Sequence, residues 1–315
     1  MGSIVPEGTL AYGLQLPVQS QSTIYVEPWE ADAGIDELAS IARACDAAGF
    51  LYVAVCDHVA IPEALAGKMS TSWWDTMTTL GYLAAITERV RLMSHVYVLP
   101  YRHPLMTAKA FLTLDEVSKG RALLGAGAGH VEAEFEVLGV DFAARGKLLD
   151  EGLDLVRAAF ADEFPVHEGE HYPVRDVGLR PRGRQAGGPP IWVGGSSPAA
   201  LRRAADKGDG WLPQGPPADG MKKGIAWILE RRERTRPGEP IDIGVNAEPI
   251  YVGDAPFEIE SYAATGTPEQ VAERLRRYRA IGVDHLQVRF RSRSATELVD
   301  QIEAFGRDVA PLLAG

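Results

Sequence analysis

The stretch that decides the fold is residues 41–62, IARACDAAGFLYVAVCDHVAIP. Its first half has the apolar spacing of an amphipathic helix and ends at Gly49, and its second half is an apolar strand, LYVAV, that leads to Asp57 and His58. A helix that leads directly into a buried strand is the repeating unit of parallel β/α proteins. In these proteins the carboxyl ends of the strands form the edge at which ligands bind, so Asp57 and His58 are candidate functional residues.

The same alternation of strand and helix continues along the chain. Strand-like apolar runs occur at residues 10–16, 51–55, 90–99, 121–126, 191–193, 210–212, 241–252 and 285–289. Helical periodicity occurs between them, at residues 35–48, 76–87, 105–118, 143–160, 198–207, 219–234, 268–281 and 295–313. Eight such units predict an α/β fold, a (β/α)8 TIM barrel, which typically needs about 250 residues. We therefore expect a single barrel domain over residues 1–315.

Two segments do not fit the barrel framework and are predicted to be insertions after strands. Residues 161–190 are polar and rich in Pro and Gly, which favours a surface insertion with a small hairpin. Residues 59–74 form a candidate lid that contains Trp73 and Trp74. The two indoles could cover a planar ligand, although packing on the barrel rim is the favoured interpretation.

Composition and charge argue against several classes of protein. No apolar run approaches the roughly 18 residues that span a bilayer, and the amino terminus lacks a signal-peptide pattern, so we expect a cytoplasmic protein that does not contact membranes. The net charge of -11 argues against nucleic-acid binding, because it repels a phosphate backbone. Cys45 and Cys56 lack metal-ligand spacing, which predicts reduced, structural thiols and no metal site.

A glycine-rich segment follows the fifth predicted strand. PIWVGGSSP, residues 190–198, places Gly194 and Gly195 just before a helix that Ser197 caps. Glycine lets the backbone approach a ligand closely, and a helix start directs free amides toward an anion, so this segment is a candidate phosphate site. The run GAGAG at residues 125–129 is not a dinucleotide fingerprint, because no acidic residue follows at the required spacing.

His58 is the candidate for proton transfer at the strand edge. A histidine has an ordinary pKa of about 6.5 and can give or take a proton near neutral pH. Asp57 or a neighbouring carbonyl could fix its tautomer.

Arginines follow the eighth predicted strand at alternate positions. Arg289, Arg291 and Arg293 would point the same way in an extended segment, so they are candidates to bind an anionic ligand. Arg102 and His103, at the end of the third strand, could contribute to the same function.

The motifs at the strand ends, taken in order, carry a family resemblance. They are CDH, RLMSHVYVLPYRHP, LLGAGAGHVEAEFEVLG, PIWVGGSSPAAL and GDGWLP. With them the chain resembles the bacterial-luciferase-like family, and in particular its branch that uses the deazaflavin coenzyme F420. The resemblance implies the TIM-barrel fold, a homodimer, a small-molecule substrate and coenzyme F420 as cofactor, with FMN as the alternative.

The resemblance also implies roles for individual residues. It places His58 over the reactive ring of the cofactor and binds the cofactor phosphate at Gly195, Ser196 and Ser197. A Glu stands at the position of His130 in relatives that act on sugar phosphates, so His130 is a second catalytic candidate and a sugar phosphate substrate is not expected. The other implied cofactor-binding residues are Asp57, Ser94, His95, Val96, Gly127, Gly129 and Gly194, with a non-proline cis peptide between His95 and Val96. The three arginines after the eighth strand would bind the acidic tail of the cofactor or an acidic substrate.

Three functions remain open on the sequence alone. The leading hypothesis is an F420-dependent oxidoreductase that transfers a hydride between the deazaflavin and a small organic substrate, oxidising an alcohol or reducing an activated double bond or carbonyl. The first alternative is a two-component monooxygenase that receives reduced FMN and activates oxygen. The second alternative is a non-catalytic protein that binds a flavin or deazaflavin.

Overall fold

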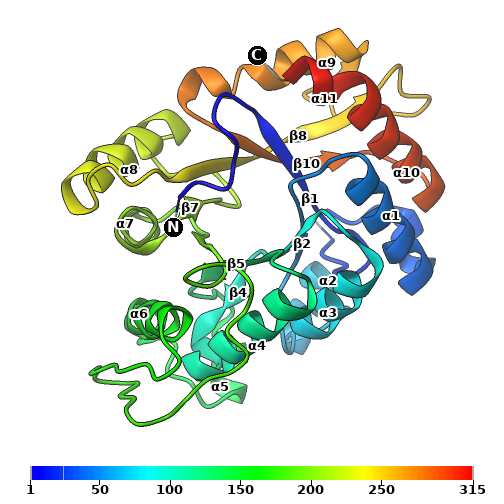
Figure 1. Cartoon of the computed structure of the whole chain (residues 1–315). Coiled ribbons are helices and arrows are strands. Elements are labelled where there is room, and N and C mark those ends of the chain that lie inside the picture. Colours follow the sequence, from blue (N-terminus) through cyan, green and yellow to red (C-terminus); the bar gives the residue numbers. More distant parts are fainter. Residues whose placement is uncertain (1, 24, 314–315) are drawn as a thin grey trace.

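The computed structural model describes residues 2–23 and 25–313, and it confirms the (β/α)8 barrel (Figure 1). The strands that form the barrel are β1 (Ala11–Gln15), β2 (Tyr52–Val55), β3 (Arg91–Ser94), β4 (Tyr97–Val98), β5 (Ala122–Gly127), β6 (Ile191–Val193), β7 (Gly210–Trp211), β8 (Asp242–Val252) and β10 (His285–Phe290). Neighbouring strands pair in parallel, and β10 pairs with both β1 and β8, which closes the barrel. Strand β4 follows β3 along the same neighbour, β5, so these two short strands share one position of the barrel.

Helices surround the barrel (Figure 1). They are α1 (Ile35–Ala47), α2 (Glu63–Met69), α3 (Thr76–Ile86), α4 (Pro104–Val117), α5 (Glu132–Val137), α6 (Arg145–Ala161), α7 (Pro198–Lys207), α8 (Met221–Thr235), α9 (Pro268–Arg276), α10 (Ala295–Ala304) and α11 (Ala310–Leu313). The periodicity of the sequence does not predict α2, α5 or the short strand β9 (Ala264–Gly266), because each is too short to display a clear repeat.

The third predicted strand, residues 90–99, is not continuous. It is divided into β3 and β4, and the bond between His95 and Val96 at the division is cis, as the family resemblance implies. Next to the division, the Ser94 hydroxyl donates to the Gly125 carbonyl at 2.9 Å and accepts from the Gly125 amide at 3.2 Å. A Cβ at Gly125 would lie 2.0 Å from the Ser94 carbonyl oxygen, so only glycine fits here. A side chain therefore replaces the regular backbone ladder, and the strand is interrupted.

Large side chains fill the barrel interior, and each lies over a glycine of an adjacent strand. Tyr52 lies over Gly13, where a Cβ would come within 2.4 Å of the phenol ring. Trp192 lies over Gly210 and His285 over Gly244 in the same way, with Cβ distances of 2.3 and 2.0 Å. Side chains alternate across a strand, so each glycine faces the interior next to a bulky neighbour. The interior of the amino-terminal half of the barrel is consequently a packed core.

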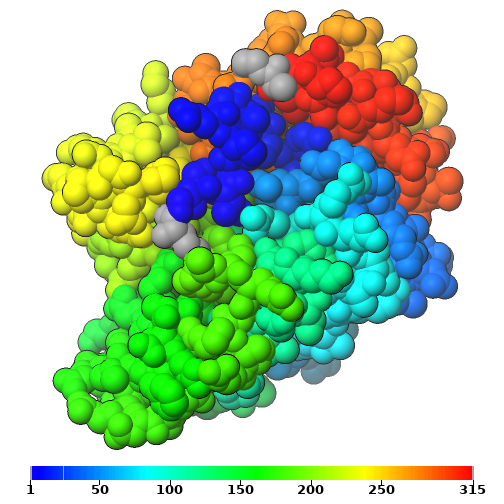
Figure 2. Space-filling model, viewed as in Figure 1, coloured from blue at the N-terminus to red at the C-terminus, as the bar shows by residue number. Residues whose placement is uncertain are grey.

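The first described residues close the amino-terminal end of the barrel. The buried carboxylate of Asp242 accepts hydrogen bonds from the Ser3 hydroxyl, from the amides of Ile4 (3.1 Å) and Val5 (3.4 Å), and from the Trp192 indole (3.2 Å). Burial raises the pKa of Asp242 above its ordinary value. In Figure 2 the amino-terminal segment, coloured blue, lies across the middle of the face in view.

The predicted insertion at residues 161–190 lies on the surface beside α6 (Figure 1). The expected hairpin is reduced to one antiparallel bridge between His167 and Val174. The segment is instead held by Glu151 of α6, which accepts from the amides of His171 (2.9 Å) and Tyr172 (2.6 Å). Elsewhere, Cys45 and Cys56 are free and buried, as predicted. Within residues 2–23 and 25–313, no helix has the length and apolar character needed to cross a membrane.

Candidate active site

His58 and Glu134 form a close pair at the carboxyl end of the barrel. His58 follows β2, and its Nδ1 lies 2.6 Å from Oε2 of Glu134, on the short helix α5. The His58 side chain keeps 11% of its surface exposed, whereas that of Glu134 is fully buried. A carboxylate accepts hydrogen bonds, so this contact assigns the proton to Nδ1 and leaves Nε2 as the free, basic nitrogen.

Glu134 is fixed from several sides, which is why it can orient His58. Its Oε1 accepts from the amides of Val59 (2.7 Å) and Ala60 (3.2 Å), and its Oε2 also accepts from the Tyr101 hydroxyl at 3.1 Å. Burial alone would raise the pKa of Glu134, but the hydrogen bond and charge of His58, together with the two amides, lower it below its ordinary value. Glu134 therefore stays ionised beside His58.

Asp57 does not orient His58, contrary to one of the sequence-based alternatives. Its carboxylate forms a two-pronged ion pair with Arg102, with both N–O distances at 2.8 Å. It also accepts from the Val98 amide at 2.8 Å and from the Thr76 hydroxyl at 3.2 Å. Asp57 thus ties the end of β2 to β4 and α3. The same contacts commit Arg102, which was a candidate to bind an anionic ligand.

Two aromatic rings lie beside His58. The ring centroid of Trp73, from the loop before α3, is 4.3 Å from that of His58, and the centroid of His130 is 5.7 Å away in an edge-to-face arrangement. Burial, followed by the charge of His58, lowers the pKa of His130, so its neutral form is favoured. The structure therefore brings both catalytic candidates, His58 and His130, together.

Val96 contacts two of the predicted cofactor-binding glycines. A Cβ at Gly127 or at Gly194 would lie 2.4 Å from a Val96 methyl group, so both positions require glycine. Gly129 has a positive φ of 77° and lies against Val98 and Phe135. These glycines let three strand ends come close together under the mouth of the barrel.

His95 is fully buried below this mouth. Its Nε2 lies 3.1 Å from the Leu212 carbonyl oxygen, which assigns the proton to Nε2. Burial lowers the pKa of His95 to about 4. Its side chain, like that of the buried Ser94, is engaged inside the barrel, so the backbone is what these two positions present toward the mouth.

The GGSSP segment has the geometry of an anion site. Ser197 caps α7 by accepting from the Ala200 amide at 3.2 Å, and the exposed Gly195 has a positive φ of 87°. Within residues 2–23 and 25–313, the amides of Gly195, Ser196 and Ser197 donate to no protein acceptor. These amides, at the positive end of a helix, suit a phosphate group.

The arginines at the end of β10 and just after it already have carboxylate partners. Arg291 pairs with Glu27 (2.5 Å) and Glu260, and Arg289 lies 3.5 Å from the same Glu27. Further out, two nitrogens of the Arg293 guanidinium donate to Glu297, at 2.9 and 3.0 Å. The three arginines are therefore balanced by three glutamates and provide no excess positive charge. Arg289 has the longest of these ion-pair distances and is the one most easily released for a ligand.

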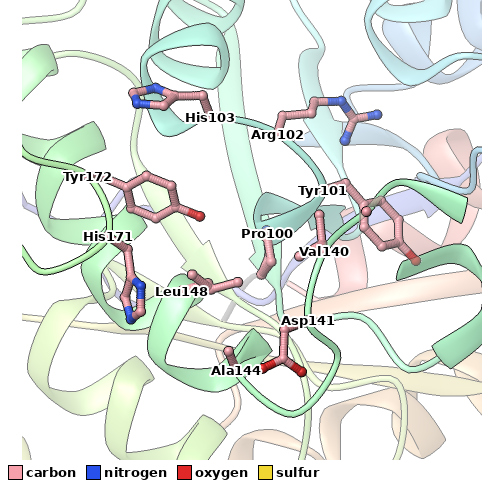
Figure 3. Close-up of a pocket in the computed structure, with 11 residues that line it drawn as sticks. Pro100, Tyr101, Arg102, His103, Val140, Asp141, Ala144, Leu148, His171 and Tyr172 are labelled. Atoms are coloured by element: carbon pink, nitrogen blue, oxygen red, sulfur yellow. The ribbon is translucent and has the colours of Figure 1, made fainter. Parts of the chain in front are cut away.

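A separate cavity of about 430 Å³ lies beside the His58 site (Figure 3). It is lined by Pro100, Tyr101, Arg102, His103, Gly139, Val140, Asp141, Ala144, Leu148, His171 and Tyr172. Two residues of the cavity wall also contact the His58 site. The Tyr101 hydroxyl donates to Glu134, and the Arg102 guanidinium pairs with Asp57. His103, the remaining candidate of the third strand end, caps α4 through its Nδ1 and faces this cavity.

Comparison with known proteins places this site in a family. A family model described as luciferase-like monooxygenase matches residues 12–264. The chain belongs to this luciferase-like family. The match includes the end of β2, the cis peptide, the GAGAG segment and the GGSSP segment.

The luciferase-like relatives differ in their cofactors. An uncharacterized protein of Mycobacterium tuberculosis is 30% identical over 240 residues, which cover 71% of this chain and 81% of that protein. An F420-dependent glucose-6-phosphate dehydrogenase of Intrasporangium calvum is 27% identical, with 91% and 98% covered. An FMNH(2)-dependent dimethylsulfone monooxygenase of Pseudomonas putida is 24% identical, with 89% and 88% covered.

Solved structures have the same luciferase-like fold. The coenzyme F420 dependent tetrahydromethanopterin reductase of Methanopyrus kandleri superposes with a TM-score of 0.74 at 18% identity, covering 96% of this chain and 99% of that one. The monooxygenase RslO1 of Streptomyces bottropensis gives 0.74 at 22% identity with the same coverage. The chain is therefore a luciferase-like oxidoreductase, of a family that uses F420 or reduced FMN.

The mouth of this luciferase-like barrel has groups that fit a flavin or deazaflavin. The free amides of Gly195, Ser196 and Ser197 suit its phosphate. Gln287, in the upper layer of the barrel, is 5% exposed, and its Oε1 is buried without a partner among the described residues. Such an acceptor suits an N–H group of the cofactor ring, because a buried polar atom is costly when unpaired.

Proposed function

We propose that this protein is a coenzyme F420-dependent oxidoreductase that oxidises an alcohol or reduces a carbonyl or activated double bond. The observation that carries the proposal is the 2.6 Å contact between His58 Nδ1 and buried Glu134. This pair has the geometry of an oriented acid/base catalyst at the carboxyl end of a TIM barrel, where active sites lie.

His58 performs the proton transfer in this proposal. Glu134 holds the proton on Nδ1, so Nε2 takes the hydroxyl proton of an alcohol while the carbon of that alcohol loses a hydride. In the reverse direction Nε2 returns the proton to the carbonyl oxygen. The deazaflavin, when bound, supplies or accepts the hydride. Glu134 stabilises the imidazolium form of His58 in either direction, because its carboxylate stays ionised.

The polarity of the mouth favours F420 over reduced FMN. A monooxygenase must protect a reactive oxygen adduct in a closed, apolar pocket, as bulk water would destroy it. Here His130 is exposed beside His58, and Gln287 donates to Gln15 (3.3 Å) and Asn246 (3.0 Å) at the top of the barrel. A deazaflavin exchanges hydrides and does not need that protection.

Cofactor titration tests the proposal. We expect the purified protein to bind F420 more tightly than FMN in a fluorescence titration, and to change the F420 absorbance in the presence of an alcohol or ketone. Tighter binding of FMN, with oxygen consumption when reduced FMN is supplied, would contradict it and favour the monooxygenase alternative.

The role of the arginines needs its own test. We expect Arg289→Gln to weaken F420 binding by a few-fold and to reduce its dependence on salt, because the acidic tail of F420 is screened by ions. Arg307→Gln is the matched control, since Arg307 is an exposed arginine of the carboxyl-terminal helix region that pairs with Asp308. Equal effects of the two substitutions would remove Arg289 from the cofactor site.

A further inference from the structure

We infer that the substrate of this site is an uncharged molecule with a flat, apolar body, such as an aromatic alcohol or ketone, and that Trp73 selects it. The inference rests on the proposed function, because it assumes that His58 faces the reacting carbon–oxygen group. It goes further by stating which substrates the walls of the site accept.

The arginines around the mouth do not favour an anionic substrate. Arg102 is held by Asp57 in a two-pronged ion pair, and Arg291 is held by Glu27 and Glu260. Arg289 shares Glu27. A carboxylate or phosphate substrate would have to displace one of these partners, and a truncated or displaced ion pair is costly where it is partly buried.

The groups that directly surround His58 add no positive charge. His130 favours its neutral form, since burial and the charge of His58 lower its pKa. The ionised Glu134, next to His58, repels a second anion. Two polar groups at the carboxyl end of the barrel, Gln15 and Gln287, are uncharged amides. Glu134 offers no ion-pair partner to a cation either, because it is fully buried and both of its oxygens already accept hydrogen bonds. The site therefore favours a neutral substrate over a charged one.

Trp73 supplies an apolar surface at the reacting group. Its indole lies 4.3 Å from the His58 ring, at an interplanar angle of 60°. The indole nitrogen donates to the Ser70 carbonyl at 3.1 Å, and Trp73 forms an antiparallel bridge with Ser20. These contacts fix the ring in place, so Trp73 is a preformed wall rather than a loose part of the lid. A flat apolar substrate can pack against such a ring.

The neighbouring Trp74 has a different role. It is partly buried against the main hydrophobic core, and its amide donates to the Gln19 carbonyl at 2.9 Å. Rim packing, the favoured interpretation for both tryptophans, therefore describes Trp74, whereas Trp73 lies at the site. This division makes Trp73 the residue to test.

Three matched ligands test the inference by binding as well as by turnover. They are benzyl alcohol, 4-(hydroxymethyl)benzoate and 4-(aminomethyl)benzyl alcohol, titrated calorimetrically into the protein with and without saturating F420. We expect benzyl alcohol to bind at least tenfold more tightly than the carboxylate or the amine. Trp73→Ala should reduce the affinity for benzyl alcohol about tenfold, as expected for loss of an aromatic contact. Trp227→Ala, which removes a partly exposed tryptophan of α8, should leave it unchanged.

A gain of binding provides the converse test. His130→Lys places a cation beside His58 at an exposed position, and we expect it to raise the affinity for 4-(hydroxymethyl)benzoate at least tenfold. If the binding order holds but no ligand reduces F420, the proposed function fails while this inference stands. If F420 is reduced but the carboxylate or the amine binds as tightly as benzyl alcohol, or if none of the three binds, the inference is wrong.

Discussion

The two ends of the barrel each contain a histidine beside a carboxylate. At the amino-terminal end, His285 Nδ1 lies 2.9 Å from Asp284 Oδ1, and at the carboxyl end His58 Nδ1 lies 2.6 Å from Glu134 Oε2. The His285 side chain is fully buried, its ring is stacked 4.2 Å from Trp192, and its Nε2 is directed at Gly244. The His58 side chain instead keeps 11% of its surface exposed, and its Nε2 has no hydrogen-bond partner among the described residues.

The comparison separates the geometry of a pair from its function. The hydrogen bond to Nδ1 is similar at the two ends, so it does not by itself define a catalytic histidine. The difference lies in the exposure of the ring, which is partial for His58 and absent for His285. At the amino-terminal end the space is filled by aromatic side chains and the first residues of the chain, whereas at the carboxyl end it is bordered by loops.

The largest expected effect is on turnover, from His58→Ala. Loss of a general acid/base group should lower kcat by about 10²–10⁴-fold. His285→Ala should do the opposite, with a stability loss of about 2–4 kcal/mol from the cavity it leaves and a kcat within a few-fold of wild type. Steady-state kinetics and urea unfolding measure both. A large kcat loss in His285→Ala with unchanged stability would break the comparison.

Packing at the amino-terminal end predicts the next effect. Gly244→Ala would place a Cβ 2.0 Å from His285 Nε2, so the ring has to shift in a filled core. We expect a stability loss of about 3 kcal/mol by urea unfolding. The control is Gly81→Ala in α3, where a Cβ meets nothing within 4 Å, and which should stabilise the protein by about 0.5–1 kcal/mol. Equal results for the two would mean that the core can adapt to the added methyl group.

A pH dependence follows from His95, which lies between the two ends. Burial lowers its pKa in the folded state to about 4, below the ordinary value of about 6.5. As the pH falls, the unfolded chain takes up the proton first, so stability is lost between about pH 6.5 and about pH 4, by about 3 kcal/mol. Urea unfolding at pH 7 and pH 4.5 measures this loss. In His95→Gln it should be smaller, and an equal loss would assign it to other groups.

A smaller effect on turnover is expected from Glu134→Gln. The amide keeps the size of the side chain but cannot stabilise the imidazolium form of His58, so kcat should fall by about 10–50-fold. The affinity for F420 and the KM of the substrate should stay within a few-fold of wild type, because Glu134 is fully buried behind His58. A loss of kcat that is matched by an equal loss of F420 affinity would mean that Glu134 has only a structural role.

The sequence predicts the barrel and part of the site. The strand positions, His58 and the GGSSP segment follow from local patterns, because each is defined by residues adjacent in the chain, whereas His130 follows from the family resemblance. Glu134 was missed. It lies in EAEFEV between two other glutamates, Glu132 and Glu136, and these letters do not distinguish the three. The signal lies in the helical register of α5, which buries Glu134 and leaves its two neighbours exposed.

Long-range ion pairs explain the other differences from the sequence-based prediction. Asp57 was expected near the cofactor, yet its partner Arg102 is 45 residues away in sequence. Arg291 is a sequence-based candidate to bind an anionic ligand, yet it pairs with Glu27, which is 264 residues away in sequence. Composition and spacing carry no information about pairs that only folding brings together. Asp57 and His58 are adjacent in the sequence but have different roles. Asp57 holds neighbouring strands together, whereas His58 is the residue proposed for proton transfer.

The bulky side chains that pack on glycines in the amino-terminal half of the barrel also limit which substitutions are possible there. Tyr52 with Gly13, Trp192 with Gly210, and His285 with Gly244 each share a fixed volume across neighbouring strands. A larger side chain at one position of a pair requires a smaller side chain at the other position. Substitutions at these positions are therefore expected to be coupled. Among homologues, the size of the residue at one position should vary inversely with the size at its partner. In the lid segment, residues 59–74, a Cβ at Gly67 would meet nothing within 4 Å, so this segment can vary without a matching change in the barrel interior.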